Sequence, residues 1–377
     1  MKSALGILSL IILPTLTILS CNASSASKAP QNQNPNVGGI TAIRSMTRTR
    51  AAHTATLLPD GKVLIAGGFD DDERTLASAE VFDPNQKTFA PTQDMNVTRA
   101  GHTATLLPNG KVLIAGGYNG NYLASAELYD PADRTFTPTN TMVAARSGHV
   151  AVLLQNGKVL LAGGVGVGWT FLRNAELYDT ATNSFAATSD MLAARESHTA
   201  TLLANGKVLI AGGHKGRRSA ITIYSSAEMY DPANGRFSGT GDMTRIRHKH
   251  EAVLLADRRV LIVGGADQRD GRPAYSSVEI FNPATGTFVA AGDMNSPRYK
   301  LQGTVVLLND GKVFIAGGSN RAEVFDPSRN RFAYVPGDMG TTRLFATATR
   351  LSNGQVLITG GYNGENQVSG QAWLFKS

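Results

Sequence analysis

The sequence predicts an all-β fold in which seven copies of a four-stranded antiparallel sheet close into a ring, a β-propeller. Two features repeat along the chain and support this prediction. A glycine pair closes an apolar run seven times, at intervals of 43 to 53 residues: Gly67-Gly68, Gly116-Gly117, Gly163-Gly164, Gly212-Gly213, Gly264-Gly265, Gly317-Gly318 and Gly360-Gly361. A Met-x-x-x-Arg motif also occurs seven times, ending at Arg50, Arg99, Arg146, Arg195, Arg247, Arg298 and Arg343. Such a period marks units that bury their apolar faces only against neighbouring copies.

Each copy contains four short runs with the character of strands. In the second copy, residues 102–107 (HTATLL) and 111–117 (KVLIAGG) flank Asn109-Gly110, a dipeptide that favours a two-residue hairpin turn. The corresponding turn of the fifth copy is Asp257-Arg258. A third run, AELYD, ends before Pro131, and a fourth contains Phe136. Proline cannot continue a ladder of backbone hydrogen bonds, so the third strand ends there.

The seventh copy is incomplete at its C-terminal end. After Gly361 it supplies one more run, QAWLFKS, and lacks a fourth strand and a methionine. The segment GITAIRSM, which ends at Met46, has the character of the missing strand. We therefore expect one propeller over residues 38–377, closed by an N-terminal strand that completes the last blade and protects the sheet edges.

The length of the unit, the glycine pair, the aromatic residue before Asp-Pro and the aromatic residue of the fourth strand resemble the kelch repeat, whose units run to about 50 residues. The resemblance covers almost all of the chain after the N-terminal segment. The sequence departs from the kelch pattern in having Phe in place of the usual fourth-strand Trp, and in a seventh unit without the third-strand acid. A WD40 repeat is excluded because neither Trp169 nor Trp373 precedes an Asp.

The kelch resemblance implies two enzyme classes to test. Copper radical oxidases of this fold need a tyrosine cross-linked to a cysteine, and the single cysteine here, Cys21, lies in the N-terminal segment, so that chemistry is excluded. Sugar epimerases or mutarotases that act on an acidic sugar remain the enzyme alternative, although no acid–base pair can be identified for them. Motifs of serine hydrolases, P-loop proteins and zinc proteases are absent from the sequence. We expect no catalytic residue and no cofactor.

The N-terminal 37 residues predict export and anchoring. Residues 1–20 have a basic start and an apolar stretch that is too short to span a bilayer, as in a signal peptide. Ile18-Leu19-Ser20-Cys21 resembles a bacterial lipobox, which would make Cys21 the lipidation site and residues 21–37 a flexible tether. Asn22 favours the outer membrane if the cell is Gram-negative. A plain signal peptide is the alternative.

The loops between second and third strands differ between copies, so we place the ligand-binding site on the face that carries them. A rigid scaffold with variable loops is a common way to hold a site. The candidate ligand-binding residues are aromatic or basic: Tyr118, Tyr122, Trp169, Phe171, Arg217, Arg218, Tyr224, Tyr275 and Tyr362. The alternative is that part of them packs under the loops.

The seven arginines of the Met-x-x-x-Arg motif allow two interpretations. They form either a ring of charge at the channel mouth for an anionic ligand, or buried ion pairs with the repeated third-strand acids. The second interpretation is favoured because both recur together; the acids are Glu80, Glu127, Glu176, Glu228, Glu279 and Glu323.

Five histidines occupy one repeat position, and we expect structural roles for them because ring symmetry keeps them apart: His53, His102, His149, His198 and His250. No metal site is expected, and Asp70-Asp71-Asp72-Glu73 is interpreted as a solvated acidic loop tip.

The formal net charge of +7 and the exported location suggest an anionic partner outside the cell, not a nucleic acid. The prediction is a monomeric, surface-exposed binding or adhesion module, attached to the membrane by its lipid, that recognises a glycan or protein ligand.

Overall fold

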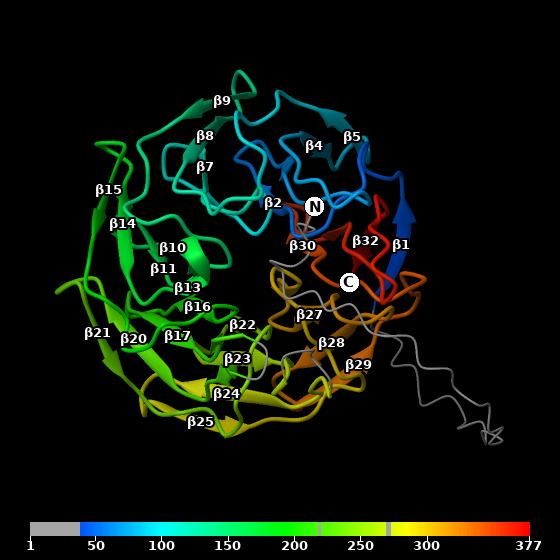
Figure 1. Cartoon of the computed structure of the whole chain (residues 1–377). Coiled ribbons are helices and arrows are strands. Elements are labelled where there is room, and N and C mark those ends of the chain that lie inside the picture. Colours follow the sequence, from blue (N-terminus) through cyan, green and yellow to red (C-terminus); the bar gives the residue numbers. More distant parts are fainter. Residues whose placement is uncertain (1–37, 218–219, 269–272) are drawn as a thin grey trace.

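The computed structural model describes residues 38–217, 220–268 and 273–377 and shows seven four-stranded antiparallel sheets arranged in a ring (Figure 1). The predicted signal peptide, residues 1–20, the predicted lipidated tether, residues 21–37, with Cys21, and the candidate site residue Arg218 lie outside the described residues. The expectation of a seven-bladed propeller is confirmed. None of the helices in the described part of the chain has the length and apolar character needed to cross a membrane.

The strands of the first four blades follow the sequence order from the channel outward. Blade 1 contains β2 (Thr54–Leu57), β3 (Val63–Ala66), β4 (Ala79–Asp83) and β5 (Thr88–Pro91). Blade 2 contains β6 (Thr103–Leu106), β7 (Val112–Ala115), β8 (Ala126–Asp130) and β9 (Thr135–Pro138). Blade 3 contains β10 (Val150–Leu153), β11 (Val159–Ala162), β14 (Ala175–Asp179) and β15 (Ser184–Ala187). Blade 4 contains β16 (Thr199–Leu202), β17 (Val208–Ala211), β20 (Ala227–Asp231) and β21 (Arg236–Gly239).

Two further blades continue this order, and loops of blades 3 and 4 add short hairpins. Blade 5 contains β22 (Glu251–Leu254), β23 (Val260–Val263), β24 (Val278–Asn282) and β25 (Thr287–Ala290). Blade 6 contains β26 (Val305–Leu307), β27 (Val313–Ile315), β28 (Glu323–Asp326) and β29 (Arg331–Tyr334). The hairpins are β12 (Val165–Gly166) with β13 (Thr170–Phe171), joined by the 3₁₀ turn η2 (Val167–Trp169), and β18 (His214–Lys215) with β19 (Thr222–Ile223).

Blade 7 joins the two ends of the chain. Its strands are β30 (Thr347–Arg350), β31 (Val356–Thr359), β32 (Ala372–Lys376) and, outermost, β1 (Gly39–Ile43). β1 pairs antiparallel with β32, from Gly39 opposite Lys376 to Ile43 opposite Ala372. The N-terminal strand therefore completes the last blade, as its sequence indicates.

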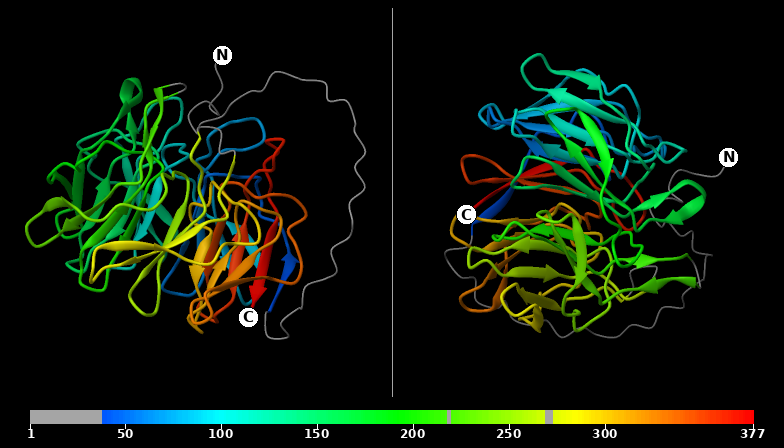
Figure 2. Two further views of the ribbon diagram at one scale, coloured as in Figure 1. Left: turned by 90° about the horizontal axis from the view of Figure 1, so that it is seen from below. Right: turned by 90° about the vertical axis from the view of Figure 1, so that its left-hand side faces the viewer.

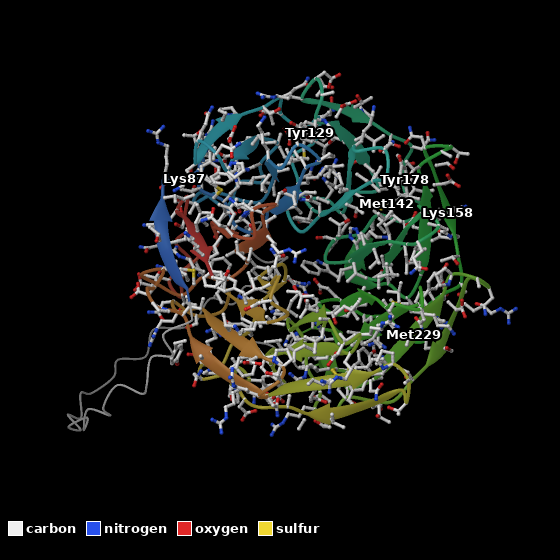
Figure 3. The ribbon with its side chains drawn as sticks, turned by 180° about the vertical axis from the view of Figure 1, so that it is seen from behind. Lys87, Tyr129, Met142, Lys158, Tyr178 and Met229 are labelled. Atoms are coloured by element: carbon white, nitrogen blue, oxygen red, sulfur yellow. The ribbon has the colours of Figure 1, made fainter. Side chains whose placement is uncertain are left out.

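The core lies between adjacent blades. The second strand of each blade is buried along its whole length, because a neighbouring blade covers each of its faces. Figure 3 labels Met142 and Tyr178, which belong to the apolar cluster between blades 2 and 3. Within blades 1 to 6 an aromatic pair joins the third and fourth strands, as in Tyr129 and Phe136, whose ring centroids lie 4.8 Å apart. Such pairs stabilise by about 0.5–1.5 kcal/mol beyond burial of their area.

A belt of backbone hydrogen bonds surrounds the channel at the face of the variable loops. The arginine of each Met-x-x-x-Arg motif lies where the chain crosses from one blade to the next and is called the crossing arginine. The belt uses the second residue after each crossing arginine, and all seven of these residues have positive φ: Ala52, Gly101, Gly148, Ser197, Lys249, Lys300 and Phe345. Except at Ser197, the N–H group of each belt residue donates to the carbonyl oxygen of the belt residue in the preceding blade, as Gly148 does to Gly101 at 3.0 Å and Lys300 does to Lys249 at 2.9 Å. Figure 2 shows the ring from the side. The belt gives every blade the same backbone at the mouth, whatever side chain it carries.

Candidate ligand-binding site at the channel mouth

The central channel contains a cavity of about 410 Å³ that opens among the inner strands. This volume lies within the range of roughly 300–1,000 Å³ that is usual for ligand pockets. Hydroxyl and small side chains from the inner strands line much of it, among them Thr54, Thr103, Thr199, Ala104 and Ala200. Three charged residues also line it: Glu196 and Lys249 from the crossings into blades 4 and 5, and Glu251 from the start of the inner strand of blade 5.

The two residues that follow each crossing arginine differ between the two sides of the mouth. Blades 1 to 3 have small residues: Ala51-Ala52, Ala100-Gly101 and Ser147-Gly148. Blades 4 to 6 have charged or large ones: Glu196-Ser197, His248-Lys249 and Tyr299-Lys300. Because the belt holds all of them in one backbone conformation, the difference lies in the side chains alone.

A chain of three titratable side chains connects blades 4 and 5 at the mouth. Glu196 Oε2 lies 3.6 Å from His214 Nε2, and His214 Nδ1 lies 3.2 Å from His248 Nδ1. His248 Nε2 lies 2.9 Å from the carbonyl oxygen of Gln268 and donates to it. The backbones of Glu196 and His214 also exchange two hydrogen bonds of 2.9 Å, which keep the carboxyl and imidazole groups side by side.

The hydrogen bonds of the two imidazoles determine which nitrogen of His214 faces Glu196 without a proton, across 3.6 Å. With Nε2–H of His248 bound to Gln268, a neutral His248 accepts at Nδ1, so His214 donates from Nδ1 and its Nε2 carries a lone pair toward the carboxyl group. Burial raises the pKa of Glu196 to about 7, against the opposing charges of Lys249 and Arg217. Burial also holds the pKa of His214 well below its usual range. The carboxyl group is therefore the member that carries the proton near neutral pH.

A second carboxyl group with a raised pKa lies on the inner strand of blade 5. Burial raises the pKa of Glu251 to about 7, although its Oε2 accepts a hydrogen bond of 2.5 Å from the Gly303 N–H group. Its Oε1 accepts from the Ala252 N–H group at 3.0 Å. The cavity thus has two carboxyl groups whose charge changes near neutral pH.

Loops of blades 2, 3 and 4 form an aromatic wall beside Glu196. The guanidinium carbon of Arg217 lies 3.2 Å from the centroid of the Trp169 ring. Trp169 is in edge contact with Tyr122, with centroids 5.8 Å apart, and Tyr122 with Tyr118 at 5.2 Å. The Tyr122 hydroxyl is enclosed without a hydrogen-bond partner among the described residues, and the nearby Glu196 adds to the burial that raises its pKa.

Phe171 also belongs to this side of the mouth, because its ring packs edge-on against His214 at 5.6 Å. Five predicted site residues are therefore brought together here: Tyr118, Tyr122, Trp169, Phe171 and Arg217.

The other three aromatic residues of the predicted site lie elsewhere. Tyr224 and Tyr275 cover crossing arginines, with the guanidinium carbon of Arg195 5.0 Å from the Tyr224 ring and that of Arg247 5.5 Å from the Tyr275 ring. Tyr362 is 1% exposed, so it is a core residue and not part of the loop surface. Its hydroxyl accepts a short hydrogen bond from Lys300 Nζ.

Six of the seven crossing arginines are buried in ion pairs with the third-strand acid of the blade that they enter. Arg99, for example, is fully buried, with Nη2 2.8 Å from Glu127 Oε1 and Nη1 2.7 Å from the Gly116 carbonyl oxygen. The same carboxylate accepts from the Asn96 N–H group at 2.7 Å. The other pairs are Arg50–Glu80, Arg146–Glu176, Arg195–Glu228, Arg247–Glu279 and Arg298–Glu323, at 2.6 to 2.9 Å. These side chains fasten the crossings to the blades and do not line the mouth.

Arg343 is the exception, because Trp373 occupies the position of the acid in blade 7. Trp373 pairs with Ile358 as Glu80 pairs with Ile65 in blade 1. The guanidinium carbon of Arg343 lies 4.8 Å from the Trp373 ring centroid, and Nη2 donates to Gln371 Oε1 and, at 3.1 Å, to the Met339 carbonyl oxygen. A cation–π contact thus replaces the ion pair in this blade.

The repeated histidines link neighbouring blades. His102 Nε2 lies 3.1 Å from the Thr54 hydroxyl, and His149 Nε2 lies 3.0 Å from that of Thr103. Val150 stands at the corresponding position of blade 3, so His198 lacks this bond. Across the described residues, no three His, Cys, Asp or Glu side chains are arranged to hold a metal ion.

Close packing explains the glycine pairs beside these histidines. Gly67 has a φ of +64°, and a Cβ atom there would lie 2.6 Å from the Arg99 carbonyl oxygen and 2.7 Å from His102 Cε1. The glycine is therefore needed for the approach of the next crossing.

Comparison with known protein families gives a match over most of the propeller. The model of the KLHDC2/KLHL20/DRC7 Kelch-repeats domain matches residues 101–318, and the Kelch motif matches residues 50–96. The chain belongs to the kelch-repeat family. A search of curated proteins gives no match.

Among solved structures, the kelch propeller is similar to a fungal alcohol oxidase described as showing catalytic diversity among the AA5 family, in complex with copper. The TM-score is 0.74 at 17% sequence identity, over 90% of this chain and 76% of that one. At this identity the likeness concerns the fold.

Sequence reasoning missed five residues of the mouth: Glu196, His214, His248, Lys249 and Glu251. A signal for three of them was present in the sequence. Blades 1 to 3 have small residues after the crossing arginine, whereas Glu196, His248 and Lys249 stand at these positions in blades 4 and 5. His214 lies in a variable loop, and nothing in the repeat pattern pairs it with Glu196.

Proposed function

We propose that the kelch propeller is an exported binding module, anchored to the membrane through Cys21, that holds a glycan or protein ligand at the channel mouth. A kelch propeller is in general a binding or interaction module. The observation that carries the proposal is the presence of two non-repeating side chains, Glu196 and Lys249, in the lining of a cavity of about 410 Å³, with the aromatic wall around Trp169 beside Glu196. Residues that break a repeat without stabilising it are best explained by a ligand.

The cavity supports a small, polar ligand or the end of a larger one. Threonines and alanines from blades 1, 2 and 4 line the channel with small side chains, and the hydroxyls of Thr54, Thr103 and Thr199 are bonded to histidine rings. The cations Lys249 and Arg217 beside Glu196 suit a ligand with an anionic group.

A glycan and protein array probed with residues 22–377 tests this proposal. The variant Tyr122→Ala/Trp169→Ala/Arg217→Ala is expected to lose the binding that the array reveals, while Lys87→Ala, in a turn on the opposite face, retains it. Normal binding by the triple variant would place the ligand elsewhere.

Fractionation of cells that express Cys21→Ala tests the anchor. Release of the protein from the membrane fraction is expected, and a variant that is processed normally and stays with the membrane would contradict lipidation.

A second candidate function is an epimerase or mutarotase for an acidic sugar. It is favoured by one observation, the Glu196 carboxyl group, whose pKa is raised to about 7 beside His214, since general acid–base catalysis works best near the operating pH. Polarimetry of sugar acids with the wild-type protein tests it. Accelerated interconversion of anomers that Glu196→Gln abolishes would establish this activity over simple binding.

A further inference from the structure

The face opposite the channel mouth has an uneven distribution of charge. It is built from the turns between first and second strands and between third and fourth strands, and it points toward the viewer in Figure 3. In blades 1 to 3 these turns hold five cations and five acids: Lys62, Lys87, Lys111, Arg134 and Lys158, with Asp60, Asp83, Asp130, Asp133 and Asp179. In blades 4 to 7 the turns and the strand residues bordering them hold eight cations and four acids: Lys207, Arg236, Arg258, Arg259, Lys312, Arg329, Arg331 and Arg350, with Asp231, Asp257, Asp310 and Asp326. We call the part of this face that blades 4 to 7 form the basic half.

The acids of the basic half are already paired. Each binds one cation of its own blade at 2.6 to 3.0 Å: Asp231 with Lys207, Asp257 with Arg259, Asp310 with Lys312 and Asp326 with Arg329. Within the described part of the chain, four exposed arginines of the basic half have no acid within ion-pair distance: Arg236, Arg258, Arg331 and Arg350. Arg350 donates to the neutral oxygens of Leu307 and Asn309, at 3.1 Å each. The basic half therefore has a positive charge that neighbouring carboxylates do not neutralise.

Arg258 stands where the other blades have a turn glycine. In those six blades the glycine has a φ between +80° and +84°, and Arg258 has a φ of +71°. This left-handed conformation is unfavourable for a residue with a Cβ atom, and such strain is found mainly at functional sites. Beside Arg258, a hollow of about 430 Å³ between the turns of blades 4 and 5 is lined by Asn205 and Arg259 as well. The fold gains nothing from the arginine, which places a cation on this face.

The chain enters the propeller in the basic half. Gly39 begins the outermost strand of blade 7 opposite Lys376. Sixteen residues separate Cys21 from residue 38, and a chain of that length reaches no farther than about 60 Å. An anchor at Cys21 would therefore keep the basic half within reach of the lipid surface.

We propose that the basic half binds the anionic headgroups of a membrane, so that the channel mouth faces away from the lipid. Guanidinium groups bind phosphate through two parallel hydrogen bonds, which makes lipid phosphates suitable partners for the exposed arginines. The four arginines come from four different blades, so they fit an extended charged surface better than a single small ligand. This inference rests on the anchor of the proposed function, and it adds the surface of the propeller that meets the membrane.

Sedimentation of residues 22–377 with lipid vesicles tests the charge. This chain contains the whole ring and lacks Cys21, so the proposed lipid cannot contribute to binding. Vesicles of phosphatidylcholine and phosphatidylglycerol in equal amounts are compared with vesicles of phosphatidylcholine alone. We expect binding to the mixed vesicles that weakens as salt is raised, and no binding to the neutral vesicles.

Two double variants with the same change in charge locate the surface. Arg236→Gln/Arg331→Gln removes two cations from the basic half and should weaken vesicle binding about 25-fold, since each cation near an anionic surface contributes about fivefold. Lys87→Gln/Arg134→Gln removes two exposed cations from the turns of blades 1 and 2 and should weaken it less than about twofold.

Arg258→Gly separates binding from folding. Glycine adopts a positive φ without strain, so the melting temperature of this variant should be unchanged or higher. Its affinity for the mixed vesicles should nevertheless fall about fivefold. An affinity equal to that of the wild type would exclude Arg258 from the surface.

Single cysteines test the orientation, because residues 22–377 contain no cysteine. An environment-sensitive dye is attached at Ala256→Cys, in the exposed turn beside Arg258, or at Val167→Cys, which is 72% exposed in a loop of the opposite face. Binding to the mixed vesicles should change the emission of the dye at position 256 and leave that at position 167 unchanged.

Three outcomes would overturn the inference. Equal losses in the two double variants would mean that net charge alone drives binding, and a response of the dye at position 167 would reverse the orientation. Tighter binding to heparin than to the mixed vesicles would assign the basic half to a soluble polyanion. The proposed function is judged separately, because the array tests the ligand site and a salt wash during fractionation of Cys21→Ala removes protein that only charge holds at the membrane.

Discussion

Blades 1 to 3 and blades 4 to 6 have the same backbone conformation at the channel mouth but different side chains. In blades 1 to 3 the belt residues are Ala52, Gly101 and Gly148, and in blades 5 and 6 they are Lys249 and Lys300, all with positive φ. The arginine–glutamate pairs beneath them are the same in both regions. The ion-pair scaffold is therefore the same in blades 1 to 6, and the charged side chains of the mouth lie on one side of the ring.

The largest expected effect is the loss of folding stability in acid. All seven histidines have lowered pKa values, mainly because burial disfavours the imidazolium form: His102, His198 and His248 to about 3, and the others well below their usual range. The unfolded chain takes up these protons near pH 6.5 and the folded one does not. Stability is therefore fully present above pH 6.5, and each histidine removes about 1.4 kcal/mol per pH unit as the pH falls below it.

The site carboxyls act in the opposite direction. Glu196 and Glu251 hold their protons up to about pH 7, so their contribution falls as pH rises from about 4.5 to 7. Melting temperatures from circular dichroism between pH 4 and 8 should thus pass through a maximum near 6.5 to 7, with a steep acid limb. In Glu251→Gln the fall toward pH 7 should be smaller. A melting temperature that is flat from pH 7 to pH 5 would contradict the neutral, buried histidines.

The next effect tests whether the scaffold is the same on both sides. Arg99→Ala in blade 2 and Arg247→Ala in blade 5 each leave a buried glutamate without its partner, so each should lower the free energy of unfolding by about 3–5 kcal/mol. Arg343→Ala is the matched control, because it removes a contact with Trp373 worth about 0.5–2 kcal/mol and unpairs no acid. Urea denaturation measures all three. Unequal losses for Arg99→Ala and Arg247→Ala would show that the scaffold also differs between the regions.

The smallest effect concerns the side chains that distinguish the regions. Ala52→Lys places a lysine in a backbone conformation that Lys249 and Lys300 already adopt, so the free energy of unfolding should change by no more than about 0.5 kcal/mol. The variant should gain no affinity for the ligand that the array reveals, because blade 1 has no counterpart of Glu196 beside the new cation. A loss of several kcal/mol in the same denaturation experiment would mean that the belt tolerates only particular residues at each position.

The sequence allowed prediction of the features that recur in each blade. Arg99 and Glu127 recur with their blades, so their pairing follows from period alone, and the missing fourth strand after QAWLFKS indicates the pairing of β1 with β32. The contact of Glu196 with His214 could not be predicted, because it depends on how a variable loop folds back over the crossing of its own blade. Burial of Tyr362 was likewise hidden, since its loop resembles the one that holds Tyr118, whereas Phe69 and Phe345 enclose it only in the closed ring.

The pairing of β1 with β32 also determines at which face of the disc the chain enters. The chain enters at Gly39, opposite Lys376, and runs along the outermost strand of blade 7 toward Met46 and the crossing at Arg50, which lies on the face of the variable loops. Residue 38 therefore emerges on the other face, with the hairpin turns. The start of the described chain and the channel mouth thus lie on opposite faces of the disc, so the anchor proposed at Cys21 would be joined to the propeller at the face away from the mouth.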